Sequence, residues 1–115
     1  MTPHHTAMRD CIDNCQSCHT ICLETAIHCL GMGGKHAAAD HIRLLWDCAE
    51  ICQTSANFMV RGSDLHAHTC RACAVVCEAC ADSCAHFGDD EQMQACAEAC
   101  RRCAASCNAM SMAAA

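Results

Sequence analysis

The sequence predicts an all-α protein, an antiparallel up-down-up-down four-helix bundle with a cysteine-lined core. Glycines divide the chain into four long segments, and no proline occurs after residue 3. Within the segments, cysteines recur at alternating steps of three and four residues, which is the period of one face of a helix. No stretch sustains the period-two alternation of a half-buried strand, so β-structure is disfavoured.

The ends of the helices are indicated by capping residues and glycines. Thr2 and Pro3 are a plausible N-cap and first helical residue. Three glycine sites break the pattern, and the last two are each followed by candidate N-caps, Ser63-Asp64 and Asp89-Asp90. The helices are therefore predicted over about 3–31, 35–61, 64–87 and 90–112. Such short connections favour antiparallel neighbours. The glycines at the breaks are Gly31, Gly33, Gly34, Gly62 and Gly88.

The composition leaves cysteine as the main core residue. The chain has 115 residues, a length typical of a single domain, here 1–115. Ile, Leu, Val and Phe together number only 15, whereas cysteine alone contributes 16. Without buried cysteine there would be too few large apolar side chains for a core.

Charge and the N-terminus indicate a cytoplasmic protein with reduced thiols. The net charge of -6 disfavours nucleic-acid partners. No run approaches the roughly 18 apolar residues of a membrane span, so no membrane association is expected. Residues 1–9 lack the charged start and apolar stretch of a secretory signal. A secreted disulfide scaffold is therefore disfavoured, and the thiols are expected to be free or bound to metal.

All sixteen cysteines share the core-facing phase of their helices. The spacing C-x3-C-x2-C-x3-C occurs three times, and Cys29 and Cys70 extend two of these runs. The second segment supplies two cysteines on a stripe that also contains His41, Leu45, Ser55 and Met59. Cysteine can fill a core simply as a small hydrophobe, but aliphatic residues would pack better without oxidising. The predicted ligands are Cys11, Cys15, Cys18, Cys22, Cys29, Cys48, Cys52, Cys70, Cys73, Cys77, Cys80, Cys84, Cys96, Cys100, Cys103 and Cys107.

A core lined with thiolates favours Cu(I) as the metal, with many ions bound per chain. Soft thiolates select Cu(I), zinc or iron–sulfur clusters. Iron–sulfur clusters usually take cysteines from loops, and four thiolates with one Zn²⁺ would leave a buried dianion. One Cu⁺ per thiolate leaves the core neutral, which predicts about one copper per cysteine, or slightly more if neutral ligands contribute.

The two ends of the predicted bundle differ in their neutral donors. One end collects Met8, Met59, His66 and Met110, with His4 one turn beyond Met8, and these are candidate ligands where copper enters. Methionines also fill cores without any metal role. The other end is expected to be more apolar and closed, although His41 there is a further candidate ligand. The remaining histidines fall off the core-facing stripes and are expected to be exposed: His19, His28, His36, His68 and His86.

No catalytic constellation is predicted, so the chain is not expected to be an enzyme. Most carboxylates fall on outward phases, and the Glu-x-x-His pattern of di-iron bundles is absent from the core-facing stripes. C-x-x-C pairs suggest thiol redox chemistry only in a βαβ setting, which this chain lacks. Two alternatives to copper storage stay open: a thiolate buffer for zinc or cadmium, and a thiol redox protein.

The repeated C-x3-C-x2-C-x3-C stripes on four short-looped helices resemble the cytosolic branch of the bacterial copper storage proteins. The resemblance covers essentially the whole chain. It implies a bundle that is folded before metal binds, that stores Cu(I) on the cysteines, and that serves copper homeostasis. It also implies a homotetramer. A copper chaperone is a further candidate partner, as donor or acceptor. Candidate contacts between protomers are Leu44, Trp46, Ile51 and Val76.

Overall fold

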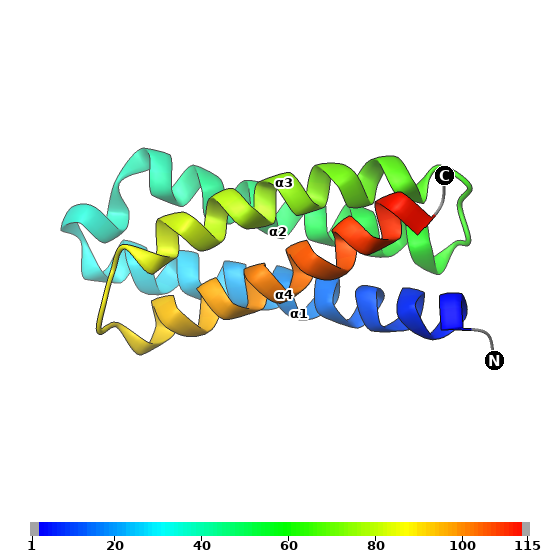
Figure 1. The fold of residues 1–115 in the computed structure, drawn as a ribbon. Coiled ribbons are helices and arrows are strands. Elements are labelled where there is room, and N and C mark those ends of the chain that lie inside the picture. The colour runs from blue at the N-terminus through cyan, green and yellow to red at the C-terminus, as the bar shows by residue number, and fades with distance from the viewer. Residues whose placement is uncertain (1–2, 114–115) are drawn as a thin grey trace.

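In the computed structural model, four helices lie side by side in an antiparallel bundle (Figure 1). The structure describes residues 3–113 of the backbone and the side chains of residues 6–112; Thr2 and the side chain of His4 lie outside these ranges. The helices are α1 (Pro3–Met32), α2 (Ala39–Val60), α3 (His66–Ala85) and α4 (Glu91–Ala113), with a short 3-10 helix η1 (Gly34–Ala37). The described residues contain no strand, and the predicted all-α fold is confirmed.

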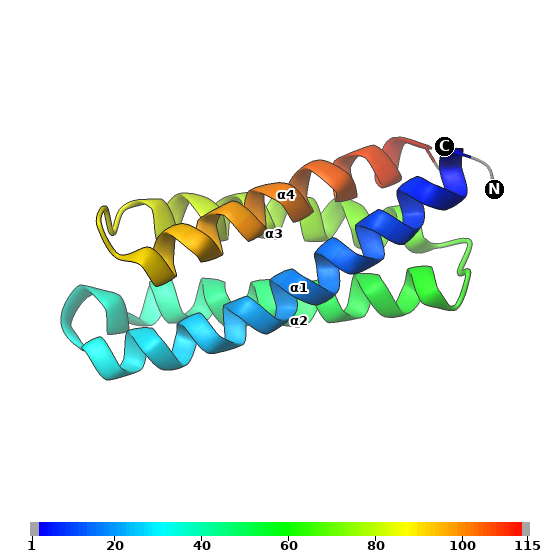
Figure 2. The same cartoon turned by 90° about the horizontal axis from the view of Figure 1, so that it is seen from below.

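Each helix packs against the two that adjoin it around the bundle. The contacts run α1 with α2, α2 with α3, α3 with α4, and α4 with α1. Figure 2 shows the same closed arrangement from below, with alternating chain directions. The bundle is elongated, with extents of 46 × 21 × 18 Å. One end therefore gathers the start of α1, the end of α2, the start of α3 and the end of α4, as predicted.

Glycines end the helices where the sequence indicates. Gly62 and Gly88 follow α2 and α3 with φ of 68° and 51°, a region in which a side chain would be strained. The N-cap predicted at Asp90 is also confirmed. Its Oδ1 accepts the backbone N–H groups of Gln92 at 3.0 Å and Met93 at 3.2 Å, which satisfies two free donors of α4.

The predicted cap of α3 at Ser63-Asp64 is wrong. The helix begins at His66, and Leu65 occupies the N-cap position without a side-chain bond. Ser63 instead closes a turn: its Oγ accepts the Leu65 N–H at 3.1 Å, and its carbonyl accepts the His66 N–H at 3.3 Å. These bonds satisfy the first donors that a helix cap would otherwise serve.

The chain between α1 and α2 also differs from the prediction, because α2 begins at Ala39 instead of residue 35. Gly33 and Gly34 both have positive φ, and the single turn of η1 begins at Gly34. Ala38 then adopts φ −59° and ψ 138°, an extended conformation that separates η1 from α2. This extra turn carries His36 back over the end of the bundle.

The core consists of sulfur and small apolar side chains. Among the side chains that the structure describes, Leu45 and Met93 are the two large apolar ones without exposed surface. Alanines such as Ala26, Ala56 and Ala81 occupy other buried positions and keep neighbouring helices close. Within residues 3–113 no helix combines the length and apolar character that crossing a membrane requires.

Since Leu45 is the one large aliphatic side chain that is fully buried among the described residues, its truncation should be costly. We expect Leu45→Ala to lower the free energy of unfolding of the metal-free protein by about 2–5 kcal/mol. The matched Leu65→Ala, at a side chain that is 60% exposed, should change it by less than about 0.5 kcal/mol. Chemical denaturation followed by circular dichroism measures both; equal effects would contradict this description of the core.

Candidate metal centre

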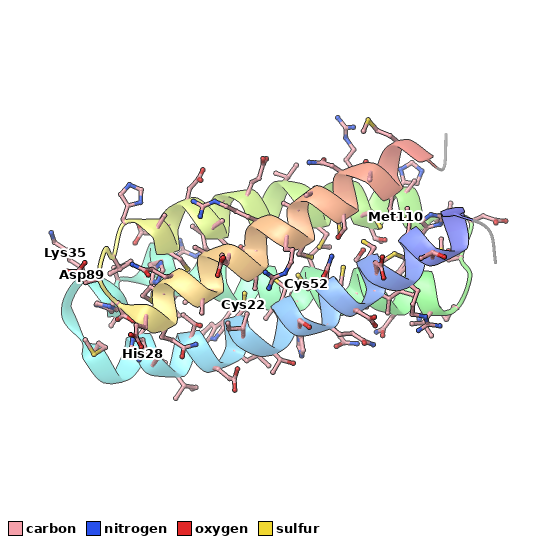
Figure 3. The ribbon with its side chains drawn as sticks, turned by 60° about the horizontal axis from the view of Figure 1, so that its bottom comes forward. Cys22, His28, Lys35, Cys52, Asp89 and Met110 are labelled. Atoms are coloured by element: carbon pink, nitrogen blue, oxygen red, sulfur yellow. The ribbon has the colours of Figure 1, made fainter. Side chains whose placement is uncertain are left out.

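Every cysteine of the chain lies in the core with a free thiol. Their relative exposures are 0 or 1%, and none is in a disulfide. The helical phase read from the sequence is therefore confirmed for all sixteen. In Figure 3, Cys22 and Cys52 lie in the interior of the bundle, between the two ends.

The thiols of α1 and α4 face one another along most of the bundle. Cys107 Sγ lies 3.6 Å from Cys11 Sγ and 3.5 Å from Cys15 Sγ. Farther along, Cys18 Sγ lies 3.7 Å from Cys100 Sγ. These contacts join residues more than eighty positions apart in the chain, so the tertiary fold, rather than local sequence, brings the sulfurs together.

Helix α2 supplies only two thiols, but they connect all four helices. Cys48 Sγ lies 3.7 Å from Cys18 on α1, 3.6 Å from Cys77 on α3 and 3.9 Å from Cys100 on α4. Cys52 lies 3.6 Å from Cys77 in the same way. The next residues on the cysteine-bearing stripe of α2 are Leu45 before this pair and Ser55 after it, and both are fully buried. The thiol-poor parts of the core are therefore the outer turns of α2.

The spacing of the sulfurs matches metal coordination without rearrangement of the helices. Neighbouring sulfurs stand 3.5–4.0 Å apart. Three sulfurs bound at roughly 2.3 Å around one metal would stand roughly 4 Å from one another. Several sets of four thiols have all their sulfurs within 4.8 Å, and these sets share members, for example Cys18-Cys22-Cys48-Cys100 and Cys18-Cys48-Cys52-Cys77. The core is thus a continuous array and not a row of separate sites.

Burial and the neighbouring thiols keep protons on members of this array. Hydrogen bonds with neighbouring thiols raise the pKa of Cys22, and the one with Cys100 has the largest effect. Burial raises this pKa further. Burial, followed by the negative charge of Asp90, raises the pKa of Cys29 to about 11. A metal that binds such thiols must displace their protons, because only the thiolate is a strong ligand.

The four neutral donors predicted for one end are found there. Met59, His66 and Met110 are buried, with exposures of 3, 8 and 2%, and Met8 is partly buried against the core. Met59 Sδ lies 3.7 Å from Cys70 Sγ, and Met8 and Met59 line the same surface cavity. His66 Nδ1 lies 2.9 Å from the Ser63 carbonyl oxygen, whereas its buried Nε2 has no partner among the described residues. We call this the Met110 end.

The opposite end, which we call the His41 end, carries its own soft donors. His41 Nε2 lies 3.4 Å from Cys29 Sγ, and its Nδ1 lies 2.7 Å from Ser83 Oγ. Cys29 Sγ is also 3.4 Å from Met93 Sδ. Burial, followed by the charge of His36, lowers the pKa of His41, which favours the neutral ring.

The expectation that this end is the more apolar one does not hold at its rim, which carries a polar cluster. His28 and His36, which were expected to be exposed, both turn their rings to one carboxylate: Nε2 of His28 lies 2.8 Å and Nε2 of His36 lies 2.9 Å from Asp90 Oδ2. Sequence periodicity missed this cluster because it depends on the path of the chain through Gly33 and Gly34. His19 is also partly buried, with Nδ1 2.7 Å from the Ala49 carbonyl oxygen. His68 and His86 are exposed as expected.

Comparison with known proteins identifies similar chains. Residues 4–112 match the family described as copper storage protein. A protein of Nitrosospira multiformis, Nmul_A1745, has a structure with a TM-score of 0.89 and 45% identity, covering 95% of this chain and 98% of that one. Cu(I)-bound Csp3 of Bacillus subtilis has a TM-score of 0.84 and 34% identity over 91% and 98% of the chains. A cytosolic copper storage protein of Streptomyces lividans, with five coppers, has a TM-score of 0.87 and 34% identity over 95% of both.

Proposed function

We propose, because the chain belongs to the copper storage protein family, that its core stores many Cu(I) ions on the thiolates of its sixteen cysteines. The whole chain would act as one copper-binding domain that holds the metal without catalytic turnover. The observation that carries the proposal is the continuous array of buried sulfurs at 3.5–4.0 Å. The Cu(I)-bound relative from Bacillus subtilis supports the choice of metal.

Charge favours Cu(I) over the open alternative of a zinc or cadmium buffer. Sets of four thiols also lie close enough together, within 4.8 Å, to bind one divalent ion. Such a site has a net charge of −2. Because the sets share cysteines, only a few divalent ions could each have four thiolates of their own. Every one of these sites would leave negative charge buried in the core. One Cu⁺ replaces one proton per thiol, so a full core stays neutral.

Anaerobic titration of the reduced protein with Cu(I), against a strong competing ligand, tests the proposal. We expect saturation near 16 equivalents, with the release of about one proton per copper bound. The double variant Cys48→Ala, Cys52→Ala should lose about two equivalents while remaining helical by circular dichroism. The exposed Met112→Leu should lose none.

Two results would overturn this assignment. Saturation near four equivalents, or displacement of the bound metal by zinc, would favour the divalent buffer. Rapid and reversible thiol oxidation linked to turnover would favour a thiol redox protein.

Copper is proposed to enter at the Met110 end. Thioether and imidazole are soft or borderline neutral ligands that bind Cu(I) more weakly than thiolate does, so they can pass it on. The buried, unpartnered Nε2 of His66 supports this role, because a buried polar atom without a hydrogen bond is costly unless a ligand uses it. The contact between Met59 Sδ and Cys70 Sγ would let a copper ion pass from the thioether to the first thiolate of the core.

Stopped-flow transfer of Cu(I) from a weak carrier ligand tests where copper enters. We expect Met59→Leu and His66→Ala each to slow loading several-fold and to change the final capacity by no more than about one equivalent. Met93→Leu is the matched control, since Met93 is a buried methionine beside a cysteine at the other end. If Met93→Leu slows loading and Met59→Leu does not, copper enters at the His41 end instead.

The protein is further proposed to act in the cytoplasm as a homotetramer and to exchange copper with a chaperone. The cytosolic relative from Streptomyces lividans supports the location. An exposed apolar surface on α1 and α2 supports the self-association: Ile27 is 69% exposed, Leu23 43%, Leu30 47% and Trp46 51%. Surface hollows flank Trp46, one lined with Leu30 and one with Leu23. Contiguous exposed apolar surface of this kind is typical of interfaces.

Light scattering after size-exclusion chromatography tests the assembly. We expect the mass of a tetramer for the unaltered protein and a smaller mass for Trp46→Glu, because a charge in a buried apolar contact is unfavourable. Val75→Glu, on α3 at a side chain that is 64% exposed, should keep the mass of the unaltered protein. A monomeric unaltered protein at micromolar concentration would contradict the proposal.

A further inference from the structure

We propose that His28, His36 and Asp90 form a binding site for one divalent transition-metal cation such as Zn²⁺, outside the thiol core. The three side chains come from three elements, α1, η1 and the residue that caps α4. The rim of the His41 end carries them, and Figure 3 shows His28 at the end of the bundle away from Met110. The role of these residues is independent of copper storage.

Two imidazole nitrogens lie against one carboxylate oxygen. His28 Nε2 and His36 Nε2 lie 2.8 and 2.9 Å from the same oxygen, Asp90 Oδ2. In the metal-free chain the imidazoles donate their Nε2–H groups to this oxygen. Around a tetrahedral cation with bonds of roughly 2.1 Å, such atoms would stand roughly 3.4 Å apart. Each ring would therefore move outward by only about 0.5 Å as the cation took the place of the two Nε2-bound protons. Each imidazole would stay neutral and carry its single proton on Nδ1 instead.

The surrounding structure orients these donors. Asp90 Oδ1 accepts the backbone N–H groups of Gln92 and Met93, which leaves Oδ2 directed to the rings. The ring of Phe87 lies 4.3 Å from that of His36, centroid to centroid, and limits its rotation. Metal ligands are commonly held by such outer contacts. The neighbouring Cys29 is directed to Met93 and His41 inside the bundle and does not join the cluster.

The donor set determines the class of metal. Two imidazoles and a carboxylate suit Zn²⁺ and similar divalent ions, and none of the three is a soft sulfur ligand for Cu(I). The side chain of His28 is 32% exposed, which leaves room for a water ligand at the open position. The single carboxylate lowers the charge of the bound cation to about +1, and because the site is at the surface, this charge remains solvated.

The alternative is that the cluster is only a hydrogen-bonded clamp that joins α1, η1 and the start of α4. In that case the rings and Asp90 would stabilise the connection without selecting a metal. Substitutions would then change stability alone. The two interpretations are distinguished by the affinity for a divalent ion, measured where sulfur cannot supply the ligands.

Co²⁺ is a suitable probe, because thiolate–cobalt charge-transfer absorption reports any cobalt that enters the core. We expect the Cu(I)-loaded protein to bind one Co²⁺ without this absorption, and one equivalent of Zn²⁺ to displace it. His28→Gln and His36→Gln should each weaken binding at least tenfold. His86→Gln, at the exposed histidine that follows the last residue of α3, should not. Asp90→Asn should also weaken binding, although its side-chain oxygen still caps α4.

The same titration of the metal-free protein tests the site whether or not the core stores copper. There, the component without charge-transfer absorption should disappear in the double variant His28→Gln, His36→Gln. Failure of the core to load Cu(I) contradicts storage and leaves this result unaffected. Cobalt binding that is absent, or equal in the unaltered protein and the double variant, overturns the outer site. Loss of thermal stability without loss of affinity identifies the clamp.

Discussion

Sulfur–sulfur contact is the interaction on which this structure depends. Cysteine is small and weakly polar, so sixteen of them can fill the centre of a bundle as apolar residues do. The same contacts, at 3.5–4.0 Å, hold the thiols at distances that a bound metal requires. The packing of the core and the placement of the ligands therefore depend on the same sulfur positions. The short loops and the alanines between the helices keep the helices close enough for these contacts.

The fold and the cysteine core could be predicted because both depend on local periodicity. Steps of three and four residues determine which face of a helix is buried, and no tertiary information is needed to see that Cys18, Cys77 and Cys103 lie on it. Gly62 and Gly88 likewise terminate helices for a reason confined to their own backbone conformation. The antiparallel order followed from the short connections.

The errors concern features that depend on how separate segments meet. The start of α3 at His66 results from hydrogen bonds within a turn around Ser63, which competes with helix capping. The meeting of His28 and His36 at Asp90 requires both the glycines of positive φ at the start of η1 and the cap of α4. Helical phase alone placed both rings on outward faces, since it contains no information about a chain that folds back over its own end.

The scarcity of large aliphatic side chains has a consequence for the lifetime of the protein. Without metal, the chain relies on thiols and alanines, with Leu45 as its one fully buried large aliphatic side chain among the described residues. On the storage proposal, each ion that binds only the folded chain adds to the free energy of unfolding by mass action. Cellular proteases degrade proteins according to the population of their opened forms. Copper-loaded molecules would then be degraded more slowly than metal-free ones. The copper supply would therefore determine the amount of the protein as well as the amount of copper bound to it.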